Sequence, residues 1–299
     1  MNSLDRLLPG KCPEMMALKR AADLVSATDA TVLILGESGS GKERLAQALH
    51  QRGPRREQPF VALAGSTLAD HPRRLLDAHG GTLFLDEVAD LPMSIQPRLL
   101  RFLECGEFHP PGADAPVRLN ARVIAASRHD LVAEVAQGRL RGELFYRLNV
   151  VPLTLPPLRQ RDGDIDLLTD RFLAELAAHY QQPLPRLTGK AREVLRKHPW
   201  PGNLRELRNM CERLVILQAG RPVGPENLPT DVTNAPRTPP GVASLPFALP
   251  EGGLDWDEME RSLILQALER CQGNRSRAAR FLGLTRDTLL YRIGKHALG

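Results

Sequence analysis

The feature that most constrains the fold is a glycine-rich loop between a predicted strand and a predicted helix. The apolar run at residues 31–35 is typical of a buried strand, and residues 44–50 have the leucine and alanine spacing of a helix. The loop begins after residue 35 and reads Gly36-Glu37-Ser38-Gly39-Ser40-Gly41-Lys42-Glu43. Backbone N–H groups at such a helix N-terminus converge on one anion, and Lys42 adds a cation for the outer phosphates. The loop therefore predicts a phosphate-binding cradle.

The last position of this loop departs from the general phosphate-loop pattern. That pattern ends in a Ser or Thr, whose hydroxyl helps to hold magnesium, and this chain has Glu43 there. The alternative interpretation is a flexible glycine turn with an exposed lysine. The strand before the loop and the helix after it supply the context that the motif requires, and they favour the phosphate loop.

Two adjacent acids follow a second buried strand. Asp86 and Glu87 come directly after the apolar run at residues 82–85. In a nucleotide-binding sheet this strand end lies beside the phosphate loop, so Asp86 can hold Mg²⁺ through water and Glu87 can polarise the attacking water. Acids commonly cap strand ends, but here the phosphate loop favours a functional role. The sequence therefore predicts ATP and Mg²⁺ as cofactors, with Asp86 as the metal-binding residue.

The chain changes character along its length. Short apolar strands alternate with helical segments up to about residue 159, which indicates an α/β layer with a parallel sheet, and only helical periodicity follows up to residue 218. Residues 221–253 hold eight of the 25 prolines and read as a linker. The predicted strands are 31–35, 60–63, 82–85, 121–126 and 150–155. The predicted domains are an α/β nucleotide-binding domain at 1–158, a small helical domain at 159–220, the linker at 221–253 and a helical C-terminal domain at 254–299.

Charge and composition limit the classes of partner. The net charge is +5, but residues 270–299 hold seven basic residues against the single acid Asp287, which suggests a polyanion partner. The four cysteines lie far apart, as expected of reduced thiols in a cytosolic protein. No stretch approaches the eighteen or more apolar residues of a membrane span. We therefore expect a soluble, cytoplasmic protein that does not enter a membrane.

Three further runs carry a resemblance to a known family. They are RGELFYRLNVV at 141–151, LPPLR at 155–159 and HPWPGNLREL at 198–207. Together with the phosphate loop they resemble the AAA+ domain of bacterial enhancer-binding proteins, the ATPases that activate sigma-54 RNA polymerase. Glu43 is usual in that family and supports the assignment. The resemblance implies an α/β AAA+ P-loop domain with a helical lid at 159–220.

The resemblance also implies roles for three arginines. Arg141 and Arg147 match the arginines that are offered to the ATP of the neighbouring subunit, where a guanidinium neutralises charge on the transferring phosphoryl group. Arg205 matches the sensor arginine of the lid, which touches ATP in its own subunit. Taken alone, each arginine is better explained as a solvated or salt-bridged side chain. Their positions within matched motifs favour the functional roles.

The basic C-terminal region reads as a helix, a turn and a second helix. Ala278 and Ala279 allow two helices to cross closely, Gly283 permits the turn, and Thr285 can cap the second helix. The pattern resembles the Fis-type helix-turn-helix of the same family, and a plain helical hairpin is the alternative. The predicted DNA-binding residues are Arg286, Asp287, Thr288 and Tyr291 in the major groove, Arg275, Arg277 and Lys295 at phosphates, and Arg292.

The chain departs from the family at several places. Relatives contact the sigma factor with a loop that carries Gly-Ala-Phe-Thr-Gly-Ala, whereas here only residues 69–80 join the second strand region to the third, without that motif. Relatives also restrain the catalytic glutamate with an asparagine where this chain has Ala64, and they have Thr-Asn where it has Ser127-Arg128. Because the resemblance starts almost at Met1, we expect no N-terminal receiver or sensor domain.

These observations leave several functions open. The first is a DNA-binding regulator in which ATP controls oligomerisation and promoter occupancy, and the missing loop favours it. The second is an ATP-hydrolysing activator that remodels sigma-54 RNA polymerase, alone or in a hetero-oligomer with a loop-bearing relative. An unrelated AAA+ machine, such as a replication initiator, fits the C-terminal region poorly. The expected partners are double-stranded DNA, RNA polymerase in some form, and further copies in a dimer to hexamer, and the expected ATPase activity is slow.

Overall fold

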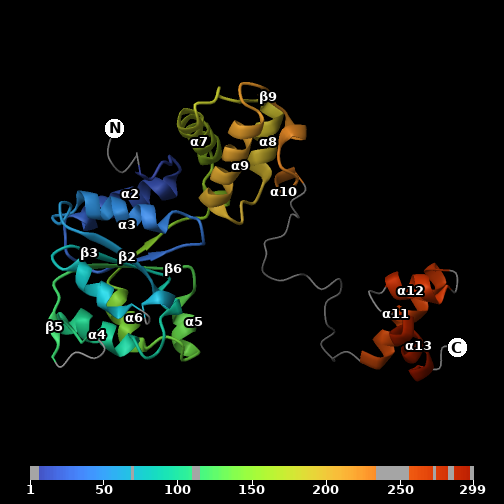
Figure 1. Cartoon of the computed structure of the whole chain (residues 1–299), viewed down its shortest axis with the longest axis horizontal. Helices are drawn as coiled ribbons and strands as arrows, with labels where there is room; N and C mark the ends of the chain where they lie inside the picture. The colour runs from blue at the N-terminus through green and yellow to red at the C-terminus, as the bar shows by residue number, and fades with distance from the viewer. Residues whose placement is uncertain are drawn as a thin grey trace. The chain divides into compact units, whose positions relative to one another are not determined.

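The computed structural model describes residues 7–68, 71–109, 115–233, 256–271, 274–281 and 286–296. Within these ranges the side chains of residues 72, 256–259, 280–281 and 286–287 are not described. The chain divides into two compact units, Met1–Pro239 and Pro240–Gly299 (Figure 1), and each is considered by itself. Among the described residues, no helix is long and apolar enough to cross a membrane.

The centre of the first unit is a five-stranded sheet. Its strands lie in the order β2-β3-β6-β1-β7, and every neighbouring pair is parallel. The carboxyl ends of all five strands therefore meet at one edge, which is where ligands bind in such sheets. The predicted α/β fold is confirmed, and each strand agrees with its prediction to within one residue at either end. The strands are β1 Val32–Leu35, β2 Phe60–Ala64, β3 Thr82–Asp86, β6 Arg122–Ser127 and β7 Val151–Thr154.

Helices cover both faces of this sheet. Alternate strand residues point to opposite faces, so Val32 and Ile34 pack in a different cluster from Leu33. The cluster of Val32 and Ile34 joins the sheet to α2 (Pro13–Ser26) and α3 (Lys42–Arg52), which lie on one side of the sheet in Figure 1. The cluster of Leu33 joins the sheet to helices on the other face. These are α4 Gln96–Cys105, α5 Leu131–Ala136 and α6 Gly142–Leu148, together with the 3₁₀ helices η2 Pro72–Ala78 and η3 Val88–Asp90.

The described residues of the connection from β2 to β3 include a segment that packs against the sheet. The connection begins with the 3₁₀ turn η1 (Gly65–Thr67) and continues into η2, whose Leu75 and Ala78 are fully buried. These apolar side chains tie η2 to the core instead of letting it project. Residues 69–70 lie outside the described part. A small antiparallel pair, β4 (Glu107–Phe108) with β5 (Val117–Arg118), was not predicted from the sequence.

The helical lid packs around Trp200, which is fully buried and donates a hydrogen bond from Nε1 to the carbonyl oxygen of Leu195 at 2.9 Å. The lid extends further than predicted. Val223, Leu228 and Val232 are buried in the same apolar cluster, so the structure differs from the predicted linker over its first residues. The elements are η4 Leu158–Gln160, α7 Asp164–Tyr180, β8 Arg186–Leu187, α8 Gly189–Lys197, α9 Asn203–Leu217, β9 Pro222–Val223, η5 Pro225–Asn227 and α10 Thr230–Thr233.

The second unit is a small helical bundle of α11 (Trp256–Arg270), α12 (Arg275–Phe281) and α13 (Arg286–Lys295). Its core contains Ala278 and Ala279, which are almost completely buried beside Ile264, Leu289 and Ile293. Two small residues at this position let α12 pack closely against its neighbours. The predicted turn residues Gly283 and Thr285 lie outside the described residues.

Candidate nucleotide-binding site and DNA-binding unit

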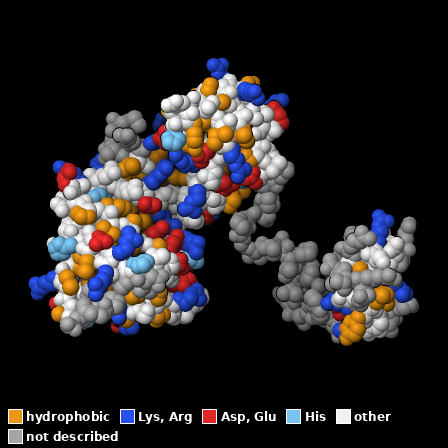
Figure 2. Space-filling view, in the orientation of Figure 1, with side chains coloured by type: hydrophobic (Ala, Val, Ile, Leu, Met, Phe, Trp, Pro, Cys, Tyr) orange, Lys and Arg blue, Asp and Glu red, His pale blue; other side chains and the backbone are white. Residues whose placement is uncertain are grey.

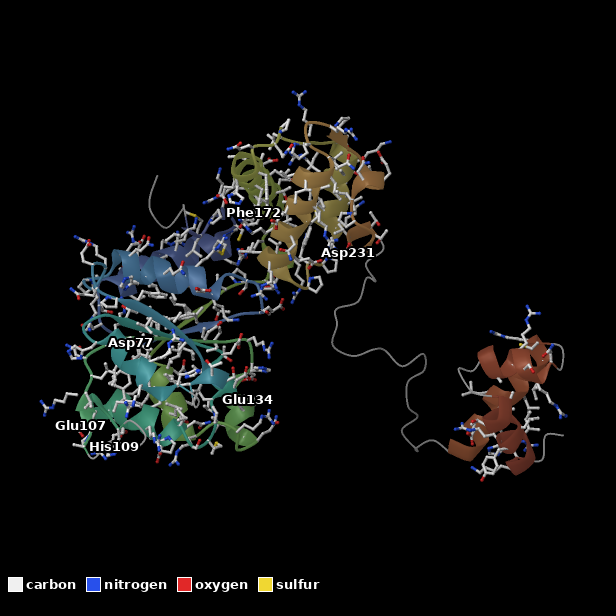
Figure 3. All side chains as sticks on the ribbon, viewed as in Figure 1. Asp77, Glu107, His109, Glu134, Phe172 and Asp231 are labelled. Carbon is white, nitrogen blue, oxygen red and sulfur yellow. The ribbon has the colours of Figure 1, made fainter. Side chains whose placement is uncertain are left out.

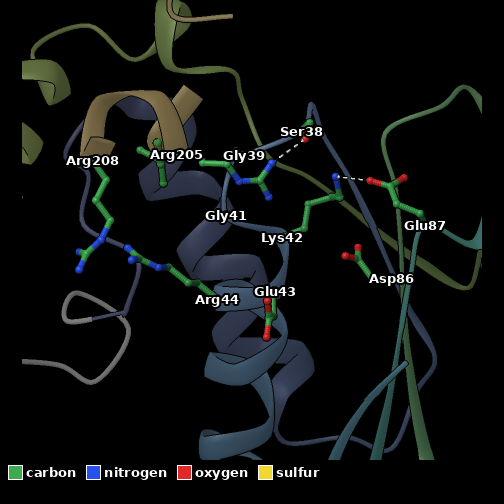
Figure 4. A pocket seen from close by; sticks show the side chains of 11 residues that line it. Ser38, Gly39, Gly41, Lys42, Glu43, Arg44, Asp86, Glu87, Arg205 and Arg208 are labelled. Atoms are coloured by element: carbon green, nitrogen blue, oxygen red, sulfur yellow. Dashed lines mark hydrogen bonds and ion pairs between the residues drawn. The ribbon is translucent and has the colours of Figure 1, made fainter. Parts of the chain in front are cut away.

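A cavity of about 260 Å³ opens at the carboxyl edge of the sheet, between the glycine loop and the lid (Figure 4). Gly39 and Gly41 have φ angles of 74° and 107°, in the left-handed region that favours glycine. A Cβ atom on Gly39 would lie only 2.3 Å from the carbonyl oxygen of Gly202, so the lid leaves no room for a side chain there. The cavity is lined by Ser38, Gly39, Gly41, Lys42, Glu43, Arg44, Asp86, Glu87, Leu204, Arg205 and Arg208.

Lys42 is held at one end of this cavity. Its Nζ atom lies 3.0 Å from Oε1 of Glu87 and donates a hydrogen bond to the carbonyl oxygen of Gly36, also at 3.0 Å. The side chain is only 7% exposed. The ammonium group therefore spans the gap between the loop and the end of β3, where an entering phosphate can replace Glu87 as its partner.

Glu87 is restrained in an unexpected way. Its backbone adopts a left-handed conformation, with φ at 51°, and its Oε2 atom accepts a hydrogen bond from the backbone N–H of Arg128 at 2.9 Å. The resemblance predicts that the usual restraint on this glutamate is missing, because Ala64 stands where relatives have an asparagine. The structure shows that a backbone group, which every residue at position 128 except proline supplies, restrains it instead.

Asp86 lies beside Glu87 in the same cavity. Burial is the largest cause that raises the pKa of Asp86 above its ordinary value, and the charge of Glu87 raises it further. Two adjacent carboxylates that repel each other favour a divalent cation, whose charge stabilises both ionised groups. The donor set therefore fits Mg²⁺ bound together with nucleotide phosphates.

The lid is tied to the loop by a network of hydrogen bonds. Asn203, at the first position of α9, donates from Nδ2 to Oε2 of Glu37 and to the carbonyl oxygen of Ser38, both at 3.1 Å. Its Oδ1 accepts from the backbone N–H of Leu158 at 2.8 Å. Arg159 donates two hydrogen bonds to Glu37, at 2.6 and 2.8 Å, which are the main cause that lowers the pKa of Glu37. Loop and lid must therefore shift together.

Three more contacts join the lid to the loop. The backbone N–H of Leu204 donates to the carbonyl oxygen of Gly39 at 3.0 Å, and Nη1 of Arg205 donates to Oγ of Ser38 at 3.2 Å. Arg161 is buried and donates from Nη2 to the carbonyl oxygen of Ser40 at 3.1 Å. A phosphate in the cavity thus meets groups from the loop, from β3 and from the lid.

Replacing Asn203 by Ala should destabilise the lid by roughly 3 kcal/mol, because buried partners lose their hydrogen bonds and Ala tolerates the left-handed backbone of this position poorly. Urea unfolding followed by Trp200 fluorescence, in a Trp256→Phe background, measures the change. Asn209→Ala, at an exposed site on the same helix, is the matched control and should shift the midpoint little. Equal stability of the two variants would contradict the role given to Asn203.

The structure brings most of the predicted nucleotide residues together. Gly36, Glu37 and Ser40 do not line the cavity but build the loop behind it. Arg141 and Arg147 do not line it either. They lie on and beside α6, about half exposed, with Arg141 near Glu143 and Arg147 near Glu104. The sequence reasoning missed three lining residues, Arg44, Leu204 and Arg208.

In the helical bundle, the predicted DNA-binding side chains divide into two groups. Arg275 and Arg277 are exposed, Thr288 is half-buried, and Tyr291 is 75% exposed. Arg292 pairs with Glu260 of α11, and Nζ of Lys295 lies 3.7 Å from the same carboxylate. The side chains of Arg286 and Asp287 lie outside the described part. The ion pairs with Glu260 hold α13 against α11, so Arg292 and Lys295 have a structural partner that the sequence did not reveal.

The fold and the cavity define a P-loop AAA+ nucleotide-binding domain with a helical lid, and three families of known domains match the chain accordingly. The Sigma-54 interaction domain matches residues 8–77 and 65–154, the AAA+ ATPase lid domain matches 159–244, and the Bacterial regulatory protein, Fis family matches 257–296. The chain belongs to the family of sigma-54-dependent transcriptional regulators, which confirms the resemblance drawn from its motifs.

Relatives agree with this assignment over nearly the whole chain. The response regulator protein PilR of Pseudomonas aeruginosa is 41% identical over 98% of this chain and 70% of its own length. The transcriptional regulatory protein ZraR of Escherichia coli (strain K12) is 38% identical over 96% of this chain and 68% of its own length. Among solved structures, NtrX from Brucella abortus in complex with ADP is 32% identical, with a TM-score of 0.73, over 99% of this chain and 71% of that chain.

Proposed function

We propose that this protein is a DNA-binding transcriptional regulator in which bound ATP controls oligomerisation and promoter occupancy. The observation that carries the proposal is the cavity shared by the glycine loop, the Asp86-Glu87 pair and the lid. NtrX, a relative of similar structure, has been solved with ADP and with ATP. A nucleotide in the cavity of this chain would contact the α/β domain and the lid at once. Its presence would therefore set the position of the lid, and with it the surface that the subunit offers to a neighbouring one.

Within this site each residue has a proposed task. Lys42 would bind the outer phosphates, and Asp86 would hold a Mg²⁺ ion, which supplies positive charge against that of the phosphates. Glu87 would polarise the attacking water while the N–H of Arg128 keeps its carboxylate in place. Arg205 of α9 would contact the phosphates, so that their presence changes the position of this helix. Arg141 and Arg147 lie away from the cavity of their own chain, which supports a role at the cavity of a neighbouring subunit.

The short connection between β2 and β3 supports occupancy over remodelling. Its η2 segment is anchored in the core by Leu75 and Ala78, and residues 69–80 do not carry the motif with which relatives contact the sigma factor. The match to the Sigma-54 interaction domain is also divided at this connection, since its two segments overlap at residues 65–77. The second candidate, an activator that remodels sigma-54 polymerase alone or with a loop-bearing relative, follows from the family membership.

Open-complex formation separates these two functions. The purified protein, sigma-54 holoenzyme, enhancer DNA and hydrolysable ATP should give no more open complex than holoenzyme alone, because residues 69–80 do not carry the motif with which relatives contact the sigma factor. A loop-bearing relative is the positive control. Strong activation by this chain that disappears in Glu87→Gln would favour remodelling and contradict the occupancy mechanism.

DNA recognition by the helical bundle gives a second test. Arg286→Ala should weaken binding to the protein's own site by roughly 1–3 kcal/mol and relax its base preference. Arg275→Ala should weaken binding to all sequences alike and flatten the salt dependence, since an exposed arginine at a phosphate carries no sequence information. Titrations of specific and random duplexes at several salt concentrations measure both. Binding that is unaffected by either change would exclude α12 and α13 as the DNA reader.

A further inference from the structure

Two arginines line the nucleotide cavity away from the lysine of the glycine loop. Lys42 lies at the end with Asp86 and Glu87, whereas Arg44 and Arg208 also line the cavity but at its other end, where Figure 4 shows their guanidinium groups turned toward each other. Arg44 belongs to α3 and Arg208 to α9 of the lid. The turn formed by Gly39 and Gly41 lies between this pair and Lys42 (Figure 4).

An aromatic ring holds the two arginines in place. Phe172 of α7, labelled in Figure 3, is 1% exposed, and its ring centroid lies 5.8 Å from the guanidinium carbon of Arg44 and 5.7 Å from that of Arg208. A buried ring beneath two guanidinium groups orients both of them and offers each a cation–π contact. The pair is therefore positioned before any ligand arrives.

The charges of this pair are poorly compensated within the protein. Among the described residues, no carboxylate lies within ion-pairing distance of Arg44. The carboxylate nearest to Arg208, that of Glu175, is 3.7 Å from it and also accepts a 2.7 Å hydrogen bond from Arg171. Burial and then the charge of Arg208 lower the pKa of the Arg44 guanidinium. Two cations that repel each other in a cavity favour an anion between them.

We propose that Arg44 and Arg208 form a second anion site, which binds a phosphate group beyond those of the 5′-triphosphate chain. Guanidinium groups suit phosphate because their N–H donors match its oxygens in pairs. The Arg208 side chain is 40% exposed and that of Arg44 is half-buried, so the site is open to solvent. Figure 2 shows Lys and Arg side chains gathered at the surface where the lid meets the α/β domain. The phosphate is either carried on the ribose of the bound nucleotide or free in solution. Because its two halves come from α3 and α9, an anion bound there would link the α/β domain to the lid.

The inference rests on nucleotide binding at the loop, so the experiment first measures the affinity of the full chain for ADP by titration calorimetry. The first arm compares AMP with adenosine 2′,5′-bisphosphate and 3′,5′-bisphosphate. One bisphosphate should bind about tenfold more tightly than AMP, as expected of a charge-assisted contact. The second arm titrates inorganic phosphate into protein that already holds a non-hydrolysable ATP analogue, which fills the γ-phosphate position.

Three variants make the assignment specific. The gain from the additional phosphate should disappear in Arg44→Gln and in Arg208→Gln, and it should persist in Arg213→Gln, which removes the same charge from another residue of α9 that does not line the cavity. A gain in the first arm identifies a nucleotide-borne phosphate, and a gain in the second identifies free phosphate.

Two results would overturn the proposal, one from wild-type protein and one from the variants. If wild-type protein binds ADP but gains nothing from either form of additional phosphate, the second anion site is wrong and the proposed nucleotide site stands. A gain that persists in both Arg44→Gln and Arg208→Gln would place the phosphate elsewhere and overturn the assignment. Failure of wild-type protein to bind ADP would instead contradict the proposed function, and this inference with it.

Discussion

Replacing Glu87 by Gln should reduce ATP turnover by roughly 10²- to 10⁴-fold, the usual contribution of a positioned general base. The variant should still bind ATP, because a glutamine side chain retains an oxygen that accepts the hydrogen bond from the N–H of Arg128. It loses the carboxylate that draws a proton from the attacking water, and with it the negative charge that pairs with Lys42. Turnover measured by phosphate release, beside affinity measured by calorimetry, separates the two effects.

Lys42→Ala gives the matched comparison at the same end of the cavity. Its ammonium group contacts both Glu87 and the carbonyl oxygen of Gly36, so its removal takes away the cation for the phosphates and leaves Glu87 without its ion pair. This variant should lose binding, whereas Glu87→Gln should keep it. Glu87→Gln with normal turnover would show that another group activates the water, and Glu87→Gln without binding would show that this residue supports the fold of the site.

The sequence was sufficient to predict the main framework of the fold. Parallel strands buried on both faces are apolar throughout, so runs such as residues 31–35 are recognisable, and the glycine loop requires a strand before it and a helix after it. The end of the lid was harder to predict. Val223, Leu228 and Val232 are widely spaced among prolines, and local composition does not show that they pack into the core around Trp200.

The residues of the site were likewise predictable only in part. Lys42, Asp86 and Glu87 were predictable because short motifs fix their positions at strand and loop ends. The restraint on Glu87 was not, since the N–H of Arg128 has no signature in the sequence. Arg44 could not be assigned to the cavity either, because its neighbours there, such as Phe172, lie far away along the chain.

Replacing Arg141 and Arg147 by Ala should lower turnover by roughly 10³- to 10⁵-fold if these guanidinium groups neutralise charge on the transferring phosphoryl group of a neighbouring subunit. Neither residue lines the cavity of its own chain, and both side chains are about half exposed and available to a second copy. Arg139→Ala, which removes an arginine paired with Glu134, is the control and should lower turnover little. Rates are compared at protein concentrations where sedimentation shows assembly.

Mixing two inactive variants tests whether the arginines act across the interface. A subunit with Arg141→Ala and Arg147→Ala keeps an intact Glu87, and a Glu87→Gln subunit keeps both arginines. At equal proportions in a ring, about a quarter of interfaces join an intact Glu87 to an intact arginine pair, so turnover should return to a measurable fraction of the wild-type rate. If assemblies form but no turnover returns, these arginines do not act between subunits, and the structure's exposed face on α6 has another use.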